Sequence, residues 1–152
     1  MIVFLVILHA LVSIALIGAI THQGFSAWRR PAPARLFVDR FRAVSPPGYA
    51  AAVCTLYVVA FALGAYIYPT YVLDVKASLA ESGLNNEIFL FQAKEHIAVI
   101  GLALLPAYYH YWRWAPLTEF VMTRRFITTT IMLVVWWNLI IGHILNNVRG
   151  LL

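Results

Sequence analysis

Charged side chains are scarce in this chain. They make up 11% of its 152 residues, whereas hydrophobic side chains make up 62%. A soluble domain is about one quarter charged, so this composition excludes an ordinary water-soluble protein. No charge at all occurs within 1–28, 43–73 or 126–148. Each of these runs is longer than the roughly 20 apolar residues that cross a bilayer core, so the missing charges predict a protein built for lipid.

Cysteine is also nearly absent. Cys54 is the single cysteine, so it cannot form an internal disulfide bond. Because it lies in an apolar run, we expect it to pack as a small core residue. The start of the chain lacks the basic residues and the cleavage site of a secretory signal. We therefore expect its first apolar segment to be kept as a membrane span.

Four apolar segments account for most of the chain, because a shorter crossing at 96–112 adds to the three uncharged runs. The sequence thus predicts a single all-α domain over 1–152, an integral membrane four-helix bundle. The expected spans are 2–21, 49–72, 88–112 and 126–148.

The basic residues predict how this bundle is oriented. The net charge is +5, and eight of the eleven Lys and Arg residues fall in two connections, 23–48 and 113–125. Positively charged loops stay in the cytoplasm, so we expect the N- and C-termini on the extracytoplasmic side of a bacterial inner membrane. This placement of charge indicates membrane topology and no binding of nucleic acid.

Histidines are the main ionisable side chains within or at the ends of the predicted spans. His96 and His110 share the third span and are fourteen residues apart. At about 100° and 1.5 Å per residue, their rings leave the helix within roughly 40° of each other and about 21 Å apart. Ionisable side chains inside a bilayer are costly and mark functional sites. Two imidazoles on one helix face, near opposite sides of the membrane, indicate two stacked haems.

This spacing leads to the hypothesis of two bis-histidine haem b sites, whose iron is bound by neutral imidazoles in a bundle core. His22 and His110 would bind the cytoplasmic-side haem, and His96 would bind the outer haem together with His143. His9 is the alternative outer ligand, but it lies about 140° from His22 around a straight helix. We prefer His143 because the glycine beside it leaves room for a flat macrocycle.

The placement of His22, His96, His110 and His143 on three of four apolar helices resembles the membrane dihaem cytochromes b. These include the integral subunits of formate dehydrogenases and hydrogenases and the small quinone-linked cytochromes b. The resemblance implies electron transport across the membrane and exchange of electrons with quinone. Because the chain is small and no soluble domain is expected in it, we expect it to work with other subunits of a larger complex.

Three charged residues beside the histidines have two readings each. Under the cytochrome hypothesis, Lys94 and Arg113 are haem propionate partners, and Glu95 is a catalytic residue that takes a proton from a quinol near the outer face. Alternatively, Lys94 and Glu95 form a self-paired cluster at a helix start, and Arg113 is a positive-inside anchor.

Two other functions stay open. In a haem-free accessory subunit of a larger membrane complex, the histidines would serve helix packing. In a metal- or proton-handling membrane protein, the outer-half histidines would act together; these are His9, His96 and His143.

Overall fold

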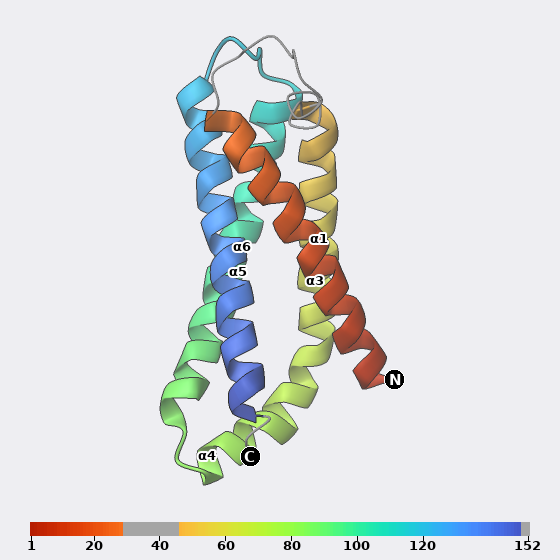
Figure 1. Ribbon diagram of the computed structural model, residues 1–152, viewed down its shortest axis with the longest axis vertical. Helices are drawn as coiled ribbons and strands as arrows, with labels where there is room; N and C mark the ends of the chain where they lie inside the picture. Colours follow the sequence, from red (N-terminus) through yellow and green to blue (C-terminus); the bar gives the residue numbers. More distant parts are fainter. Residues whose placement is uncertain (29–45, 150–152) are drawn as a thin grey trace.

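The computed structural model describes residues 1–28 and 46–149 (Figure 1), and this part of the chain is made of helices and short connections, with no strand. The helices are α1 (Ile2–Trp28), α3 (Pro46–Thr70), the π-helix η1 (Tyr71–Val75), α4 (Lys76–Glu81), α5 (Asn85–Arg113) and α6 (Val121–Arg149). The predicted all-α fold is therefore confirmed.

Within residues 1–28 and 46–149, four stretches are long and apolar enough to cross a membrane: Ile2–Trp28, Gly48–Glu81, Asn85–Arg113 and Val121–Val148. By the length and composition of these helices, the chain is a multi-pass membrane protein. Each predicted span lies within one of them. The observed helices are longer than the predicted spans. The first span, for example, was expected to end at 21, whereas α1 ends at Trp28.

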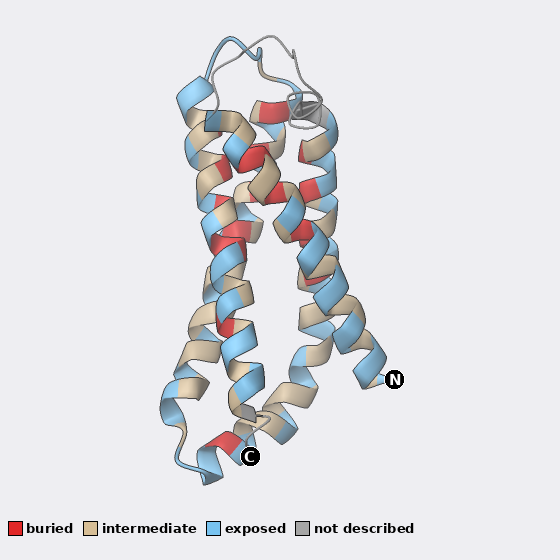
Figure 2. Ribbon diagram, in the orientation of Figure 1, coloured by how far each residue is buried: buried red, intermediate tan, exposed pale blue. Residues whose placement is uncertain are grey.

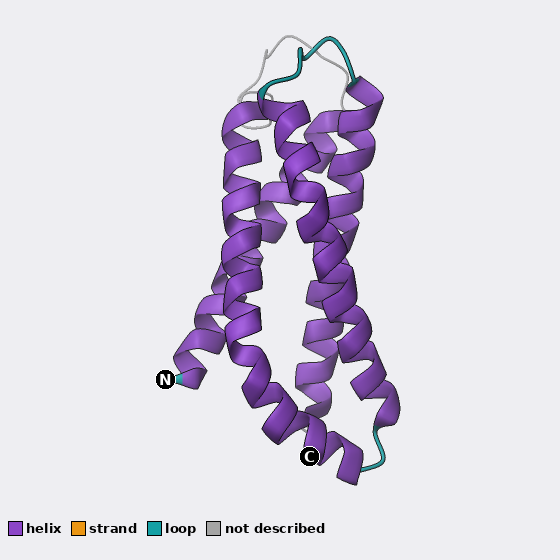
Figure 3. Ribbon diagram, turned by 180° about the vertical axis from the view of Figure 1, so that it is seen from behind, coloured by secondary structure: helices purple, strands orange, loops and turns teal. Residues whose placement is uncertain are grey.

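The four long helices form a bundle in which α1 and α5 occupy opposite corners. Both of these helices pack against α3 and against α6. The start of α1 and the end of α6 lie toward the same end of the bundle as α4 (Figure 1), and we call this the α4 end. The connection between α5 and α6 lies at the other end, here called the loop end. Figure 3 shows the same arrangement from behind.

The tightest packing lies toward the loop end, where most of the buried residues gather (Figure 2). The side chains of Tyr108, Ile20 and Ile131 have no exposed surface there. The hydroxyl of Tyr108 donates a hydrogen bond to Oε1 of the buried Gln23, which joins α5 to α1 directly across the bundle. This contact explains why α1 continues past residue 21, since the polar Gln23 has its partner inside the protein.

Indole groups tie α6 to its neighbours by hydrogen bonds to threonine hydroxyls. Trp112 of α5 donates to Thr128 over 2.9 Å. Two more bonds link α1 and α6: they run from Trp28 to Thr129, at 2.8 Å, and from Trp136 to Thr21, at 2.9 Å. A buried N–H without a partner is costly, so these pairs let tryptophan face neighbouring helices at little cost.

Candidate functional site

The five histidines differ in burial. His9 and His22 are half-buried, whereas His96, His110 and His143 are exposed on the outside of the bundle. A haem held between helices needs both of its imidazole ligands turned inward. The described arrangement therefore does not form the two facing histidine pairs that the haem hypothesis requires.

The packing of the loop-end half of the bundle is a second observation against the two-haem hypothesis. Its centre is filled by side chains, with Tyr108 bonded to Gln23 where a cytoplasmic-side haem would lie. The ring of His22 packs against Tyr49, with 5.4 Å between centroids. The ring of His110 instead meets Tyr111 and Trp114 edge-on. Haem b does not fit between these side chains as they are placed, and the expected propionate partner Arg113 is exposed.

The residues of the expected outer haem site, His96 and His143, and those of the alternative metal site are not brought together either. The exposed His143 shares a hydrogen bond of 3.1 Å with Asn147, one turn further along α6. Among the residues that the structure describes, no group of three or more His, Cys, Asp and Glu side chains could hold a metal ion. The set of His9, His96 and His143 is therefore not brought together as a metal centre.

A different group of polar residues does meet, in the half of the bundle toward the α4 end. Nζ of Lys94 lies 3.1 Å from Oε1 of Glu95 and 4.7 Å from the centre of the Phe91 ring. Phe91 stacks in turn on Tyr71 of η1, with 3.5 Å between centroids and 9° between planes. The Lys94–Glu95 self-pairing is thus observed, but it adjoins other helices and does not stand alone in solvent.

His9 joins this group from α1. Its ring lies against Gly64 of α3, where an added Cβ would be 3.3 Å from Cε1 of the imidazole. The ring is also beside the backbone of Ala60 and within electrostatic range of both Lys94 and Glu95. Together His9, Tyr71, Lys94 and Glu95 form what we call the polar cluster, assembled from three segments far apart in the sequence.

The polar cluster contains a buried atom that makes no hydrogen bond with the described residues, Oη of Tyr71. Nδ1 of His9 is also buried, and the only partner within its reach is the backbone of Ala60, at a geometry too poor for a normal hydrogen bond. An unpaired buried polar atom costs about 1–3 kcal/mol. Native structures keep few of them, and those that persist often belong to functional sites. The Glu95 carboxylate lies within electrostatic range of both side chains. These features make the polar cluster the candidate functional site.

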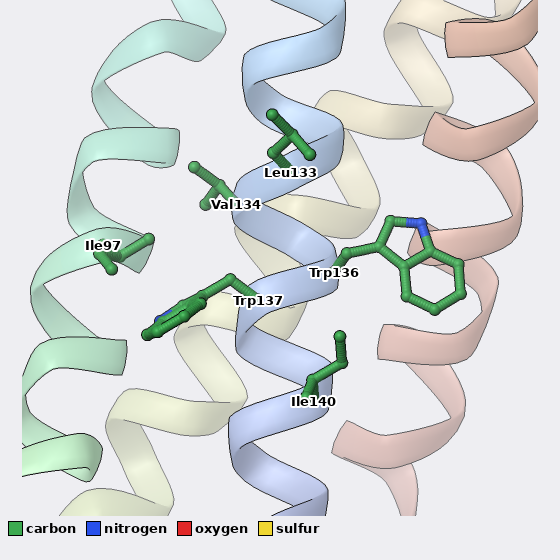
Figure 4. A pocket seen from close by; sticks show the side chains of 6 residues that line it. All are labelled: Ile97, Leu133, Val134, Trp136, Trp137 and Ile140. Atoms are coloured by element: carbon green, nitrogen blue, oxygen red, sulfur yellow. The ribbon is translucent and has the colours of Figure 1, made fainter.

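A wide-open apolar pocket of about 420 Å³ lies along α6 near the polar cluster, with Ile97 of α5 on one side and Trp136 turned toward α1 on the other. Its lining residues are Ile97, Leu133, Val134, Trp136, Trp137 and Ile140 (Figure 4). Ile97 follows Lys94 by three residues, so both lie on one side of α5. Lys94 also packs on α6, since an added Cβ on Gly142 would lie 3.8 Å from its Cε. The pocket and the charged pair are thus neighbours.

Sequence reasoning identified Lys94 and Glu95 but did not assign Tyr71 or the pocket, and it held His9 only in reserve. The available signal for His9 was its depth, because it lies in the same half of the membrane as Glu95. Nothing in the sequence marked Tyr71 among the other tyrosines of its helix.

Comparison with known proteins gives no relative for this chain, because no family model, curated protein or solved structure matches it.

Proposed function

We propose that this protein is a quinone-linked subunit of a larger complex in a bacterial inner membrane, and that its polar cluster takes protons from a bound quinol. The observation that carries the proposal is that Glu95 lies within electrostatic range of His9 and of Tyr71, whose buried hydroxyl has no partner among the described residues, on the same stretch of α5 as the pocket residue Ile97. A pocket lined by hydrophobic and aromatic side chains, with a few converging polar groups, is typical of small-molecule sites.

The chemistry divides between the two parts of the site. The apolar pocket takes the lipid-soluble part of the quinol, and Lys94 points its ammonium toward the head group. Oxidation of a quinol to quinone releases two protons and two electrons. Glu95 accepts the two protons of the quinol hydroxyls one after the other, and passes each to His9 before it takes the next. The electrons pass to a redox centre of a partner subunit.

The orientation expected from the basic loops completes this proposal. With the α4 end on the extracytoplasmic side, protons leaving through His9 are released outside the cell. His9 lies eight residues after Met1, about 12 Å along α1, which is a short distance to that surface.

Tryptophan fluorescence tests the proposed binding of quinone, because Trp136 and Trp137 line the pocket. We expect a short-chain ubiquinone analogue to quench the emission of the purified full-length protein in a saturable way. Trp137→Phe should lose much of the saturable part. Trp114→Phe, at the loop end, should keep it.

The Glu95→Gln variant separates binding from proton transfer. It should still show saturable quenching but release protons more slowly when the complex oxidises quinol. Quenching that rises linearly with quinone concentration and is the same in every variant would contradict the proposal.

The dihaem cytochrome b, whose histidine pairs do not face each other among the described residues, has a direct test of its own. Pyridine haemochrome quantification decides it: two haems per chain would establish the cytochrome, and a count of zero would reject it. Substitution of His110 should remove one of the two haems.

A further inference from the structure

The ring of Tyr71 is held in a fixed position at the start of the π-helix η1. It stacks on Phe91 with 9° between the planes, and Tyr68 stacks on the same Phe91 ring at 6.1 Å. A π-helix is rare and is frequently found at a functional site. The stack therefore fixes where the phenol oxygen of Tyr71 lies.

That oxygen has no hydrogen-bond partner in the described part of the chain, although it is buried. A phenylalanine at this position would make the same ring stack without burying an unpaired hydroxyl, which costs free energy. Packing thus explains the ring of Tyr71 but leaves its hydroxyl without a role. An acceptor from outside the chain would give it one.

The location of the hydroxyl indicates where that acceptor comes from. Phe91, Lys94 and Ile97 follow one another at intervals of three residues, so they form a row that winds around α5, with each step turning about 60°. Ile97 lines the apolar pocket, Lys94 lies in the middle, and Phe91 carries the stacked Tyr71. A molecule whose tail fills the pocket places its head group at Lys94, next to Tyr71.

We propose that Tyr71 donates a hydrogen bond to an oxygen of the quinone head group and so makes the site specific for a ligand with an oxygen acceptor at that position. This inference rests on the proposed quinone-linked function and assigns a specificity-determining residue to it. Tyr71 positions the head group, whereas Glu95 takes the proton.

The test compares Tyr71→Phe with Tyr68→Phe, because both changes remove one hydroxyl and keep the stacked ring. The affinity for a short-chain ubiquinone analogue is measured by tryptophan quenching in the full-length protein. We expect Tyr71→Phe to bind about tenfold more weakly, the loss of one hydrogen bond. Tyr68→Phe, whose side chain is exposed, should bind as the native protein does.

Thermal unfolding supplies a second measurement without quinone. Because the Tyr71 hydroxyl has no partner within the described chain, Tyr71→Phe should unfold at the same temperature as the native protein or a higher one. A lower unfolding temperature would show that the hydroxyl serves the fold, and it would overturn the inference.

The binding outcomes separate this inference from the proposed function. Saturable quenching with equal affinity in the native protein and Tyr71→Phe would overturn the role of Tyr71 and leave the proposed function standing. An equal loss in both tyrosine variants would also overturn it, because the effect would then belong to the aromatic stack. Absence of saturable quenching in the native protein would overturn both.

Discussion

At the scale of single residues, close helix contacts depend on positions without a side chain. Tyr57 of α3 donates a hydrogen bond to the carbonyl of Ala98 on α5 over 2.8 Å. It reaches this carbonyl by lying over Gly101, where an added Cβ would overlap the Tyr57 hydroxyl and lie 2.8 Å from Val134. Small residues of this kind let helices approach closely in a membrane.

Gly101→Ala should therefore destabilise the bundle by about 1–3 kcal/mol, because Tyr57 and Val134 have to move to admit a methyl group. Gly18→Ala is the matched control, since nothing lies within 4 Å of its added Cβ. Thermal unfolding in detergent measures both variants. Equal unfolding temperatures for the two would contradict the close contact at Gly101.

The residue scale also shows why the polar cluster was only partly predictable. Glu95 and Lys94 were identified because charges inside an apolar chain are conspicuous. His9 and Tyr71 belong to the cluster only through the packing of α1 on α3 and of η1 on α5. Such contacts between distant segments have no counterpart in the local sequence.

At the scale of elements, the connection between α5 and α6 is held by Arg124, which is 3% exposed. Its guanidinium donates to the carbonyls of Tyr111 and Pro116, at 3.2 and 2.7 Å, and to that of Glu119. The fork of donors on arginine suits several acceptors at once, whereas lysine offers only a compact charge. Arg124 thus ties the start of α6 to the end of α5.

Arg124→Met should lower the stability by about 2 kcal/mol, because it removes the hydrogen bonds to these partly buried carbonyls. The stability of Arg124→Lys should lie between that of Arg124→Met and that of the native protein. Arg113→Gln, at an exposed position, is the control and should change little. If Arg124→Met unfolds like the control, the connection does not depend on this residue.

The elements themselves were largely predictable. Runs without charge located all four long helices, since length and apolarity decide what can cross a bilayer. The structure adds the π-helix η1 and the short α4, between 71 and 81, whereas the second predicted span ended at 72. A π-helix depends on a one-residue shift of hydrogen bonding, which the apolar pattern does not record.

At the scale of the whole molecule, the sequence predicted the bundle but not which face of each helix points inward. His96 and His110 were expected on one inward face of α5, whereas the side chains of both are exposed in the structure. In a soluble helix, hydrophobic residues mark the buried side, whereas a membrane helix is apolar all round and carries no such mark. The sequence therefore could not show whether the four imidazoles face the inside of the bundle.

The central claim is that the pocket and the polar cluster together form a quinone site, and photolabelling tests it most directly. A photoreactive quinone should label α5 near 91–97 and α6 near 133–140, and unlabelled quinone should abolish this labelling. Labelling of α1 near His22 or at the loop end, or labelling that competition leaves unchanged, would contradict the account.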